Sequence, residues 1–315
     1  MTTEDLQIRP YQPADDAPQV MQLMASSLGW TDDPFFEAFF RWKHQDGPWG
    51  PSPSWVSVTA DGRIVGFRAM MRWQFTRGGT PVTAVRAVDT ATDPSFRGRG
   101  IFRTLTLHAV EQLAAQGVDM VFNTPNEQSR PGYLKMGWHE VGQLPVRMVP
   151  TTPGKLMNLR GARTGADLRS IPTEVGVAAV DVIDRAVPVA TAGRLHTQRS
   201  PEYLRWRYGL ADLHYRAIAG PRGVVIFRLR RRGTAVECVV ADLLVRDAQV
   251  ARSAVRWLRH NSGADYLIGL ASDPRPIGGI PIPGQGPMLT WRPLASSWRP
   301  ELGDFAVSMG DIELF

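Results

Sequence analysis

The sequence predicts an α/β fold built on a mixed β-sheet, and three features indicate it. Apolar runs of strand length alternate along residues 6–150 with segments whose apolar residues recur at helical spacing. Glycine-containing turns at Asp61-Gly62 and Gly78-Gly79 separate consecutive strand-like runs, which is typical of β-hairpins. A β-branched run at 82–92 then leads through a glycine-rich loop into a helix-like run at 103–116.

Each element of the first half can be placed in order. A strand is expected at 6–11, followed by a helix at 14–27 with acidic residues near its start. A second helix follows the capping sequence at 31–34 and carries a cluster of aromatic residues. The remaining expected elements are strands at 55–59, 63–75 and 82–92, a helix at 103–116, a strand at 118–123, a short helix after Asn126 and a closing strand at 141–150.

The loop at 97–103 has the composition of an anion-binding site. Gly98 and Gly100 allow the backbone N–H groups to turn inward, and the helix that follows adds unpaired donors and a positive dipole. Arg97, Arg99 and Arg103 flank these glycines. The segment matches neither the Walker nor the dinucleotide-binding pattern. It therefore predicts a cradle for a pyrophosphate of another kind.

Two motifs in this region resemble those of the GNAT acetyltransferase superfamily. Arg97, Gly100 and Phe102 resemble the acyl-CoA signature R-x-x-G-x-G/A, with Phe102 where Gly or Ala is usual. A second stretch resembles the family pattern N-x-x-A-x-x-x-Y-x-K-x-G-F/W, and it is formed by Asn126, Ser129, Tyr133, Lys135, Gly137 and Trp138. Over about residues 5–150 the resemblance implies a GNAT fold with splayed central strands and acetyl-CoA as the co-substrate.

The resemblance also implies roles for individual residues. Tyr133 is expected to be the general acid, because a phenol with a pKa of about 10 can protonate a leaving thiolate of similar basicity. Backbone groups of Ala91 and Thr92 are expected to hold the pantetheine arm where the splay leaves ladder groups unpaired. The full set of expected cofactor-binding residues is Ala91, Thr92, Arg97, Gly98, Arg99, Gly100, Ile101, Phe102, Asn126 and Ser129.

A base must remove a proton from the attacking amine. Asp89, three residues before Thr92, is expected to be catalytic in this way through one water molecule, and the alternative is a structural role within the sheet. Glu127 is a second candidate base, although the sequence favours a solvated carboxylate at a helix cap for it. The terminal carboxylate of Phe315 is a remote candidate, because some tandem GNAT enzymes place a chain terminus in the active site.

The region joining the first two helices overlies the acceptor in this family. The residues expected to contact the substrate are therefore Trp30, Asp32, Asp33 and Phe36. Acidic side chains there would suit a cationic amine. For the aromatic residues of the second helix, packing in the core is the alternative.

The second half of the chain repeats the first weakly. Four short stretches of the second half resemble stretches of the first half and occur in the same order. The first of these pairs is 204–207, which resembles 40–43. The echo at 245–250 lacks the glycines of the loop, and no Tyr-x-Lys-x-Gly equivalent follows. We therefore expect a GNAT acetyltransferase domain at 1–150, a linker at 151–194 and a smaller, degenerate GNAT-like domain at 195–315, which walls one side of the substrate cleft.

Composition narrows the classes of function. The net charge is +6, but all but three of the 36 basic residues are scattered arginines, and no nucleic-acid-binding motif accompanies them. The single cysteine excludes a disulfide framework and a cysteine-based metal site, and the histidines show no metal-binding spacing. No membrane span or signal sequence is evident, so a cytoplasmic location is expected.

These features favour a GNAT N-acetyltransferase that transfers an acetyl group from acetyl-CoA to a primary amine of a small molecule in a ternary complex. The expected cofactor is acetyl-CoA without a metal, and the expected partner is the amine rather than nucleic acid or membrane; a homo-oligomer is compatible with the sequence. Two alternatives remain open, a non-catalytic CoA-binding module and an aminoacyltransferase of the tandem-GNAT peptidoglycan type.

Overall fold

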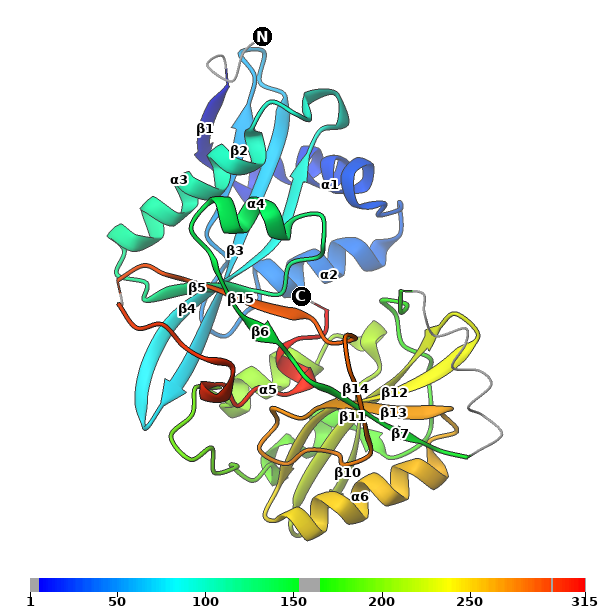
Figure 1. Ribbon diagram of the computed structural model, residues 1–315. Helices are drawn as coiled ribbons and strands as arrows, with labels where there is room; N and C mark the ends of the chain where they lie inside the picture. The colour runs from blue at the N-terminus through cyan, green and yellow to red at the C-terminus, as the bar shows by residue number, and fades with distance from the viewer. Residues whose placement is uncertain (1–5, 153–164, 296, 315) are drawn as a thin grey trace. The chain divides into compact units, whose positions relative to one another are not determined.

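The computed structural model describes residues 6–152, 165–295 and 297–314 (Figure 1). The chain divides into two compact units. The first unit comprises Met1–Gln74, Pro81–Val141 and Leu289–Arg299, and the second comprises Phe75–Thr80, Gly142–Met288 and Pro300–Phe315. Each unit thus includes segments that lie far apart in the sequence, which differs from the simple division at residues 150 and 195.

The first sheet is mixed, as expected. Across it lie β1 (Gln7–Pro10), β2 (Ser54–Val58), β3 (Ile64–Arg77), β4 (Thr80–Thr92), β5 (Met120–Asn123), β15 (Met288–Pro293) and β6 (His139–Gln143), with β9 (His196–Thr197) paired to the end of β3. Its helices are α1 (Pro13–Leu28), α2 (Pro34–His44), α3 (Ile101–Ala115) and α4 (Arg130–Lys135), and a 3₁₀ turn, η2 (Pro94–Phe96), precedes α3.

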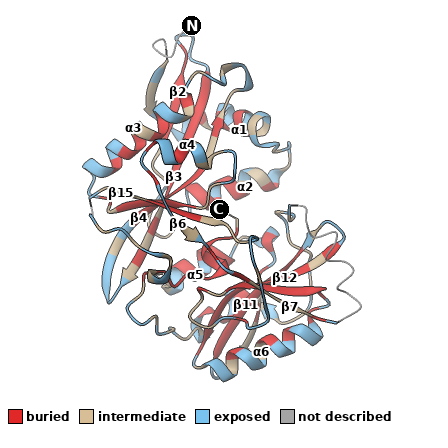
Figure 2. Cartoon of the chain, in the orientation of Figure 1, coloured by how far each residue is buried: buried red, intermediate tan, exposed pale blue. Residues whose placement is uncertain are grey.

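The helices of the first unit bury apolar residues on both faces of its sheet (Figure 2). Ile101, Leu105 and Ala109 of α3 belong to a core cluster with Val85 of β4, whereas α1 and α2 contribute to a separate cluster with β2 and β3. At Gly66, an added Cβ would lie 2.5 Å from Cγ2 of Ile101. The first turn of α3 therefore lies directly on β3, and this contact fixes the position of the loop that precedes it.

The central strands splay apart, which confirms the expectation drawn from the family resemblance. β4 and β5 form a parallel ladder only from Ala84 to Arg86, paired with Met120 to Phe122. Beyond Arg86, β4 continues to Thr92 without a ladder partner on its β5 side among the described residues. Backbone groups along this stretch are therefore left for another partner.

The second unit contains its own sheet. Across it lie β14 (Ile280–Ile282), β7 (Val146–Pro150), β13 (Tyr266–Leu270), β12 (Ala235–Val245), β11 (Gly223–Arg232), β10 (Arg216–Gly220) and β8 (Val177–Ala178). Its helices are α5 (Pro201–Tyr208) and α6 (Ala248–Asn261), with 3₁₀ turns η4 (Ala179–Arg185), η5 (Ala211–Leu213), η6 (Leu302–Asp304) and η7 (Met309–Asp311).

The second sheet repeats the topology of the first. The strands β10 to β13 pair antiparallel, antiparallel and then parallel, with α6 between β12 and β13. The strands β2 to β5 follow the same order, with α3 between β4 and β5. The echoes in the sequence therefore correspond to a repeated structural unit, which supports the tandem arrangement.

The two sheets exchange a strand, which the sequence pattern did not reveal. β7, expected to close the first sheet, pairs instead with β13 and β14, and β15 from near the end of the chain pairs with β5. Residues 165–194, expected to be a linker, also contribute to the second unit, because Ala166 and Ile171 bridge to β11 and β8 pairs with β10. An apolar strand pattern specifies burial but does not name the neighbouring strand.

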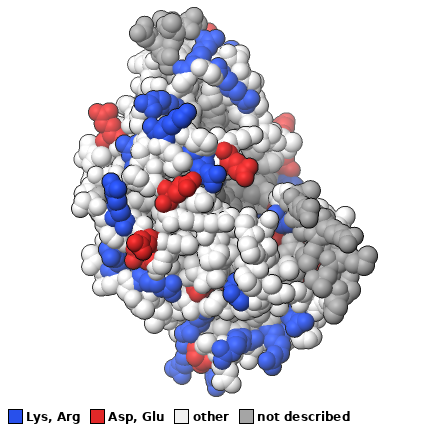
Figure 3. Space-filling view, in the orientation of Figure 1, with Lys and Arg blue, Asp and Glu red and all other residues white. Residues whose placement is uncertain are grey.

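On the visible face of the molecule, the basic side chains are not gathered into a single patch (Figure 3). On the face shown in Figure 3, basic side chains form several separate groups with acidic side chains among them. Within the described ranges, no helix has the length and apolar character that crossing a membrane requires. In the same part of the chain, no group of three or more His, Cys, Asp or Glu side chains is arranged to hold a metal ion.

Candidate active site

The glycine loop before α3 presents unpaired amide groups. Gly98 and Gly100 adopt left-handed φ angles of 77° and 79°, and no atom lies within 4 Å of the position that a Cβ would take. The backbone N–H groups of Gly98, Gly100, Ile101, Phe102 and Arg103 donate to no residue that the structure describes. Such a row of donors at a helix start is a site for an anion.

The charges around the loop support this function. Arg97 and Arg103 are exposed and have no acidic partner in the described part of the chain. Arg99 lies 4.6 Å from the ring centre of Phe96 and Asp93 is paired with Arg63, so neither neighbour fills the cradle. The net positive charge therefore remains available to a diphosphate.

Tyr133 lies next to this loop, in α4. Its ring meets that of Phe102 edge-on, with centroids 5.4 Å apart, and it also packs against Trp138. A Cβ on Gly132 would lie 3.1 Å from the Phe102 ring. The bulky residue at the position where the family usually has Gly or Ala is thus accommodated by a glycine in α4, and it joins the loop to Tyr133.

Arg68 of β3 is a site residue that the sequence analysis did not assign. Its guanidinium is fully buried and its Nη1 donates a hydrogen bond of 2.8 Å to the Tyr133 hydroxyl. Among the described residues it has no carboxylate partner, and its Nε has no hydrogen-bond acceptor. The available signal was a single charge within the apolar strand sequence at 64–71.

The residue that corresponds to Arg68 in the second unit is paired with a carboxylate, which it shares with Arg207 and Arg230. Arg228 occupies the corresponding strand β11, and its Nε donates to the Glu313 carboxylate at 3.0 Å. A buried cation is costly unless it is paired, so an unpaired one in the first unit indicates a use for its charge.

Asp89 lies in β4 with a left-handed φ of 37° and is held by the end of α2. Its carboxylate accepts from Lys43 Nζ at 3.0 Å and contacts His44 Nε2 at 2.8 Å. Burial alone would raise the pKa of the Asp89 carboxyl, but the Lys43 ammonium and the His44 ring outweigh it and hold that pKa well below its usual range. Both carboxylate oxygens are therefore engaged and weakly basic.

The second unit contains a carboxylate that corresponds to Asp89. Asp242 occupies the corresponding place in β12, and its carboxylate accepts from Tyr208 Oη at the end of α5. In both units a strand carboxylate thus anchors the last residue of the overlying helix. This correspondence supports the structural alternative for Asp89.

The expected acceptor residues lie together around a hollow of about 650 Å³, which is lined by Trp30, Asp32 and Asp33 and also by Glu37. Phe36 does not line it directly, but its ring stacks on Trp30 with centroids 5.2 Å apart. Asp33 also caps α2 by accepting a hydrogen bond of 2.9 Å from the Phe35 amide. The lining of the hollow therefore combines three carboxylates with the ring of Trp30.

The other expected residues occupy defined places. The Asn126 Oδ1 accepts from the Ser129 amide and hydroxyl, each at 2.9 Å, and so stabilises the turn that starts α4. Ala91 is buried in the core, and the Thr92 carbonyl accepts from Ser27. Glu127 is exposed on the same turn as Asn126. Phe315 lies outside the described residues.

Comparison with known protein families gives a match to the first unit. Residues 7–141 match the family described as Acetyltransferase (GNAT) domain. A curated relative, glucosamine 6-phosphate N-acetyltransferase of Trypanosoma brucei brucei, is 37% identical over 78 residues, which cover 24% of this chain and 52% of that protein. The chain thus spans about half the length of this relative.

Solved structures resemble nearly the whole chain. A conserved Enterococcus faecalis V583 protein, described as a probable N-acyltransferase, has a TM-score of 0.64 at 13% identity, covering 92% of this chain and 73% of its own. A GCN5-related N-acetyltransferase from Kribbella flavida has a TM-score of 0.61 at 16% identity, and the match covers 92% of this chain and 71% of the other. Eis1 from Mycobacterium abscessus has a TM-score of 0.56 at 14% identity, and the match covers 92% of this chain and 74% of Eis1. At these identities the likeness shows a shared fold.

Proposed function

Because residues 7–141 of this chain belong to the GNAT acetyltransferase family, we propose that it is an N-acetyltransferase. The reaction is the transfer of an acetyl group from acetyl-CoA to a primary amine of a small molecule, by direct attack of the amine in a ternary complex. Acetyl-CoA supplies an activated thioester. The residues of this chain bind it, orient it and provide the proton for its leaving group.

This proposal rests on the backbone N–H groups of the loop that have no acceptor among the described residues. Five N–H groups between Gly98 and Arg103 donate to no described residue, and Arg97 and Arg103 add unpaired positive charge beside them. A diphosphate fits this set of donors because it offers several acceptor oxygens and a negative charge. On its β5 side, β4 has no ladder partner beyond Arg86 in the described ranges, and this edge is suited to an amide-bearing arm near Ala91 and Thr92, although the Thr92 carbonyl already accepts from Ser27.

Tyr133 is suited to hold the proton that the leaving thiolate needs. Its oxygen accepts a hydrogen bond from Arg68, and no described group accepts the phenolic proton in turn. The proton is therefore free to be donated into the site. Arg68 fixes the orientation of the hydroxyl and places an uncompensated positive charge beside it, which favours the negative charge that develops on sulfur.

We propose Asp89 as a positioning residue rather than as the base. Its oxygens are occupied by Lys43 and His44, and its lowered pKa makes it a poor proton acceptor at neutral pH. It holds the end of α2, whose start contributes to the acceptor hollow. Glu127, exposed and without a partner in the described ranges, is then the carboxylate to test as the base.

The acceptor is proposed to be a cationic amine without a phosphate group. The hollow near Trp30 carries the carboxylates of Asp32, Asp33 and Glu37, which would attract an ammonium ion and repel a phosphate. The curated relative is named for an amino-sugar phosphate. An unphosphorylated amino sugar therefore combines the amine of that relative's substrate with the charge that this hollow favours.

The test is a panel of amines assayed with acetyl-CoA for release of the free CoA thiol. The panel contains amino sugars with and without phosphate, polyamines and amino acids. We expect turnover with an unphosphorylated cationic amine. Tight acetyl-CoA binding without turnover on any amine would favour a non-catalytic CoA-binding module, and absence of CoA binding would favour the aminoacyltransferase alternative.

A further inference from the structure

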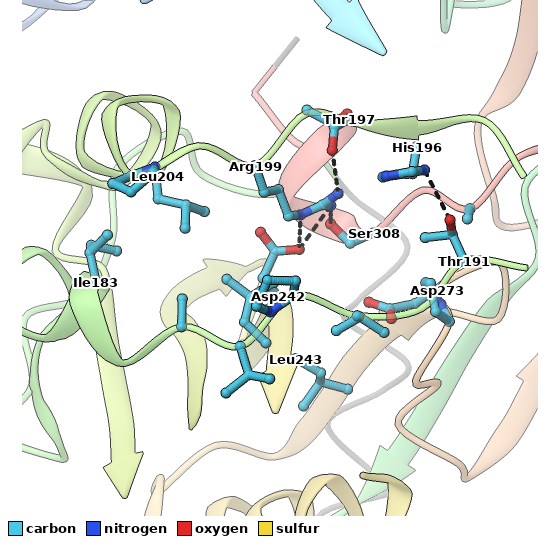
Figure 4. Close-up of a pocket in the computed structure, with 18 of the residues that line it drawn as sticks. Ile183, Thr191, His196, Thr197, Arg199, Leu204, Asp242, Leu243, Asp273 and Ser308 are labelled. Carbon is cyan, nitrogen blue, oxygen red and sulfur yellow. Dashed lines mark hydrogen bonds and ion pairs between the residues drawn. The ribbon is translucent and has the colours of Figure 1, made fainter. Parts of the chain in front are cut away.

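The second unit contains a cavity of about 320 Å³ that the transferase proposal does not use (Figure 4). Leu243 and Leu244 of β12 form one wall, and Asp273, which follows β13, forms another. The ladder between β12 and β13 covers only Glu237 to Val239, so the two strands have separated at this depth. The cavity therefore lies where the repeated fold splays for a second time.

This cavity is not a second CoA site. At the start of α6 the Asp247 carboxylate accepts from the amides of Gln249 at 3.0 Å and Val250 at 2.9 Å. The Asp247 side chain thus binds backbone amides at the start of α6, whereas the corresponding amides at the start of α3 in the first unit have no acceptor among the described residues. Because the helix start is already neutralised, a diphosphate would be repelled there.

Two carboxyl groups of the cavity wall, Asp242 and Asp273, accompany one guanidinium, that of Arg199, and Asp311, which does not line the cavity, also pairs with Arg199. The Arg199 guanidinium is shared between Asp242, at 3.1 Å, and Asp311, at 2.8 Å. Asp273 is a third carboxyl, and its one described partner is the backbone N–H of Arg275, at 2.8 Å. Its other oxygen has no hydrogen-bond partner among the residues described, and Figure 4 draws no interaction between Asp273 and the other lining residues.

The remaining walls are mostly aliphatic. They are formed by segments of the second unit that include Ile183, Val187, Val189, Leu204, Pro274 and Ala306. A cavity of a few hundred Å³ with apolar walls and a few convergent polar groups is typical of small-molecule sites. An apolar body would bury favourably there, and a cationic head would offset the excess carboxylate charge.

We propose that this cavity binds a small organic cation, a primary ammonium group on an aliphatic body, with the Asp273 carboxylate as its ionic partner. The site is separate in sequence and in unit from the Tyr133 site and does not depend on the transferase activity. Its described lining residues all belong to the second unit.

The electrostatics of Asp273 give the site a pH dependence. Burial raises the pKa of Asp273 to about 8, the Arg275 amide opposes this, and among the facing charges Asp242 and Asp311 reinforce it while Arg199 opposes it. His196 also lines the cavity, where its Nδ1 contacts Thr191 Oγ1. The empty site is therefore largely protonated at pH 7, and a bound cation would displace that proton. Affinity for the cation should rise with pH up to about 8 and then level off.

The experiment is calorimetric titration of n-butylammonium into the full chain without acetyl-CoA, at pH 6.5, 7.5 and 8.5. We expect saturable binding that is tightest at pH 8.5, with proton release at pH 6.5 and 7.5 detected by comparing buffers of different ionisation enthalpy. The neutral isostere n-butanol should bind at least about tenfold more weakly.

Two variants locate the site. Asp273→Asn, which imitates the protonated carboxyl, should fold normally and lose at least about tenfold in affinity. Asp184→Asn is the matched control, since Asp184 also lines the cavity but is 80% exposed and paired with Arg205, and it should bind the probe normally. Ala306→Leu, which fills the cavity without touching the carboxyl, should also weaken binding.

Several results would overturn the proposal. These are no binding at millimolar concentrations, equal binding of the alcohol, and unchanged binding in Asp273→Asn. Loss of binding in Asp32→Asn but not in Asp273→Asn would place the probe in the acceptor hollow of the first unit and would equally contradict it. Because no acetyl-CoA is present, these outcomes are independent of whether the chain is an acetyltransferase.

Discussion

The Nη1 nitrogen of Arg68 lies 2.8 Å from the hydroxyl oxygen of Tyr133 and donates a hydrogen bond to it. The two residues are 65 positions apart, and each is almost completely buried. The tyrosine proton is consequently directed away from the arginine, and the arginine charge is left without a described counter-ion. In the second unit the equivalent arginine is paired with Glu313 instead. This contrast agrees with the proposal that the transferase site lies in the first unit.

Replacing Tyr133 by Phe should remove the proton donor while keeping the aromatic packing against Phe102 and Trp138. We expect kcat to fall by about 100-fold or more, because general acid catalysis typically contributes that much. The KM for acetyl-CoA and the thermal stability should change little. Unchanged turnover in this variant would exclude Tyr133 as the acid.

Replacing Arg68 tests whether the charge beside the phenol is used. Arg68→Lys keeps a cation but loses the planar donor, and we expect kcat to fall by about tenfold with an unchanged KM for acetyl-CoA. Arg68→Met should lose more, by about 100-fold, because no charge remains. The melting temperature of each variant is measured alongside. A Met variant that is as active as the Lys variant would show that the arginine only packs.

Gly100, one of the two left-handed glycines of the loop, should affect the binding of CoA rather than the turnover rate. In Gly100→Ala, open space surrounds the new methyl group, so the cost arises from the φ of 79°, which disfavours a residue with a Cβ. We expect the Kd for CoA to rise by about tenfold as the loop relaxes.

Gly62→Ala is the matched control for this change. Gly62 also has a left-handed φ, of 87°, and open space around it, but it lies in the turn between β2 and β3. Both variants should lose about 1 kcal/mol of stability, and only Gly100→Ala should weaken CoA binding. Equal effects of the two substitutions on the Kd would contradict the cradle.

Asp89→Asn should destabilise the protein, because it removes the carboxylate that pairs with the buried Lys43 ammonium. We expect a loss of about 3 kcal/mol at pH 7. The folded-state pKa of Asp89 is lowered, so its contribution is present above the ordinary carboxyl pKa of about 4 and is lost as the pH falls toward the folded value. The difference in melting temperature between wild type and variant should therefore narrow below about pH 4.

Activity distinguishes the two roles of Asp89. A positioning residue predicts that kcat per folded molecule stays within about tenfold of wild type, whereas an essential base predicts a loss of about 1,000-fold, and the loss of stability is expected in either case. Asp32→Asn serves as a stability control, because Asp32 is exposed and should leave the melting temperature unchanged at either pH.

The sequence predicted those parts of the site that depend on local chemistry. The glycines of the loop and the helix after them are neighbours in the chain, and their conformation follows from residue type. The family resemblance added the splay of β4 and β5, which the strand pairing confirms. It also assigned a role to Tyr133, whose place beside Phe102 is consistent with that role.

The features that were missed depend on contacts between distant segments. Nothing in the pattern of β7 or β15 indicates that β7 pairs with β13 or that β15 pairs with β5, because apolar alternation fixes burial and not pairing partners. The Arg68 contact with Tyr133 likewise arises only when β3 and α4 are packed on α3. Asp89 was recognised as a notable carboxylate, but its engagement by Lys43 and His44 required the position of α2.

The most direct test of the account is a titration of ¹⁵N-glycine-labelled protein with CoA, followed by amide NMR. The Gly98 and Gly100 signals are assigned from their disappearance in the corresponding alanine variants. We predict that both amide resonances shift on saturation, as expected for donors to a diphosphate, while that of Gly62 does not. Binding of CoA with the Gly98 and Gly100 resonances unmoved would contradict the central claim.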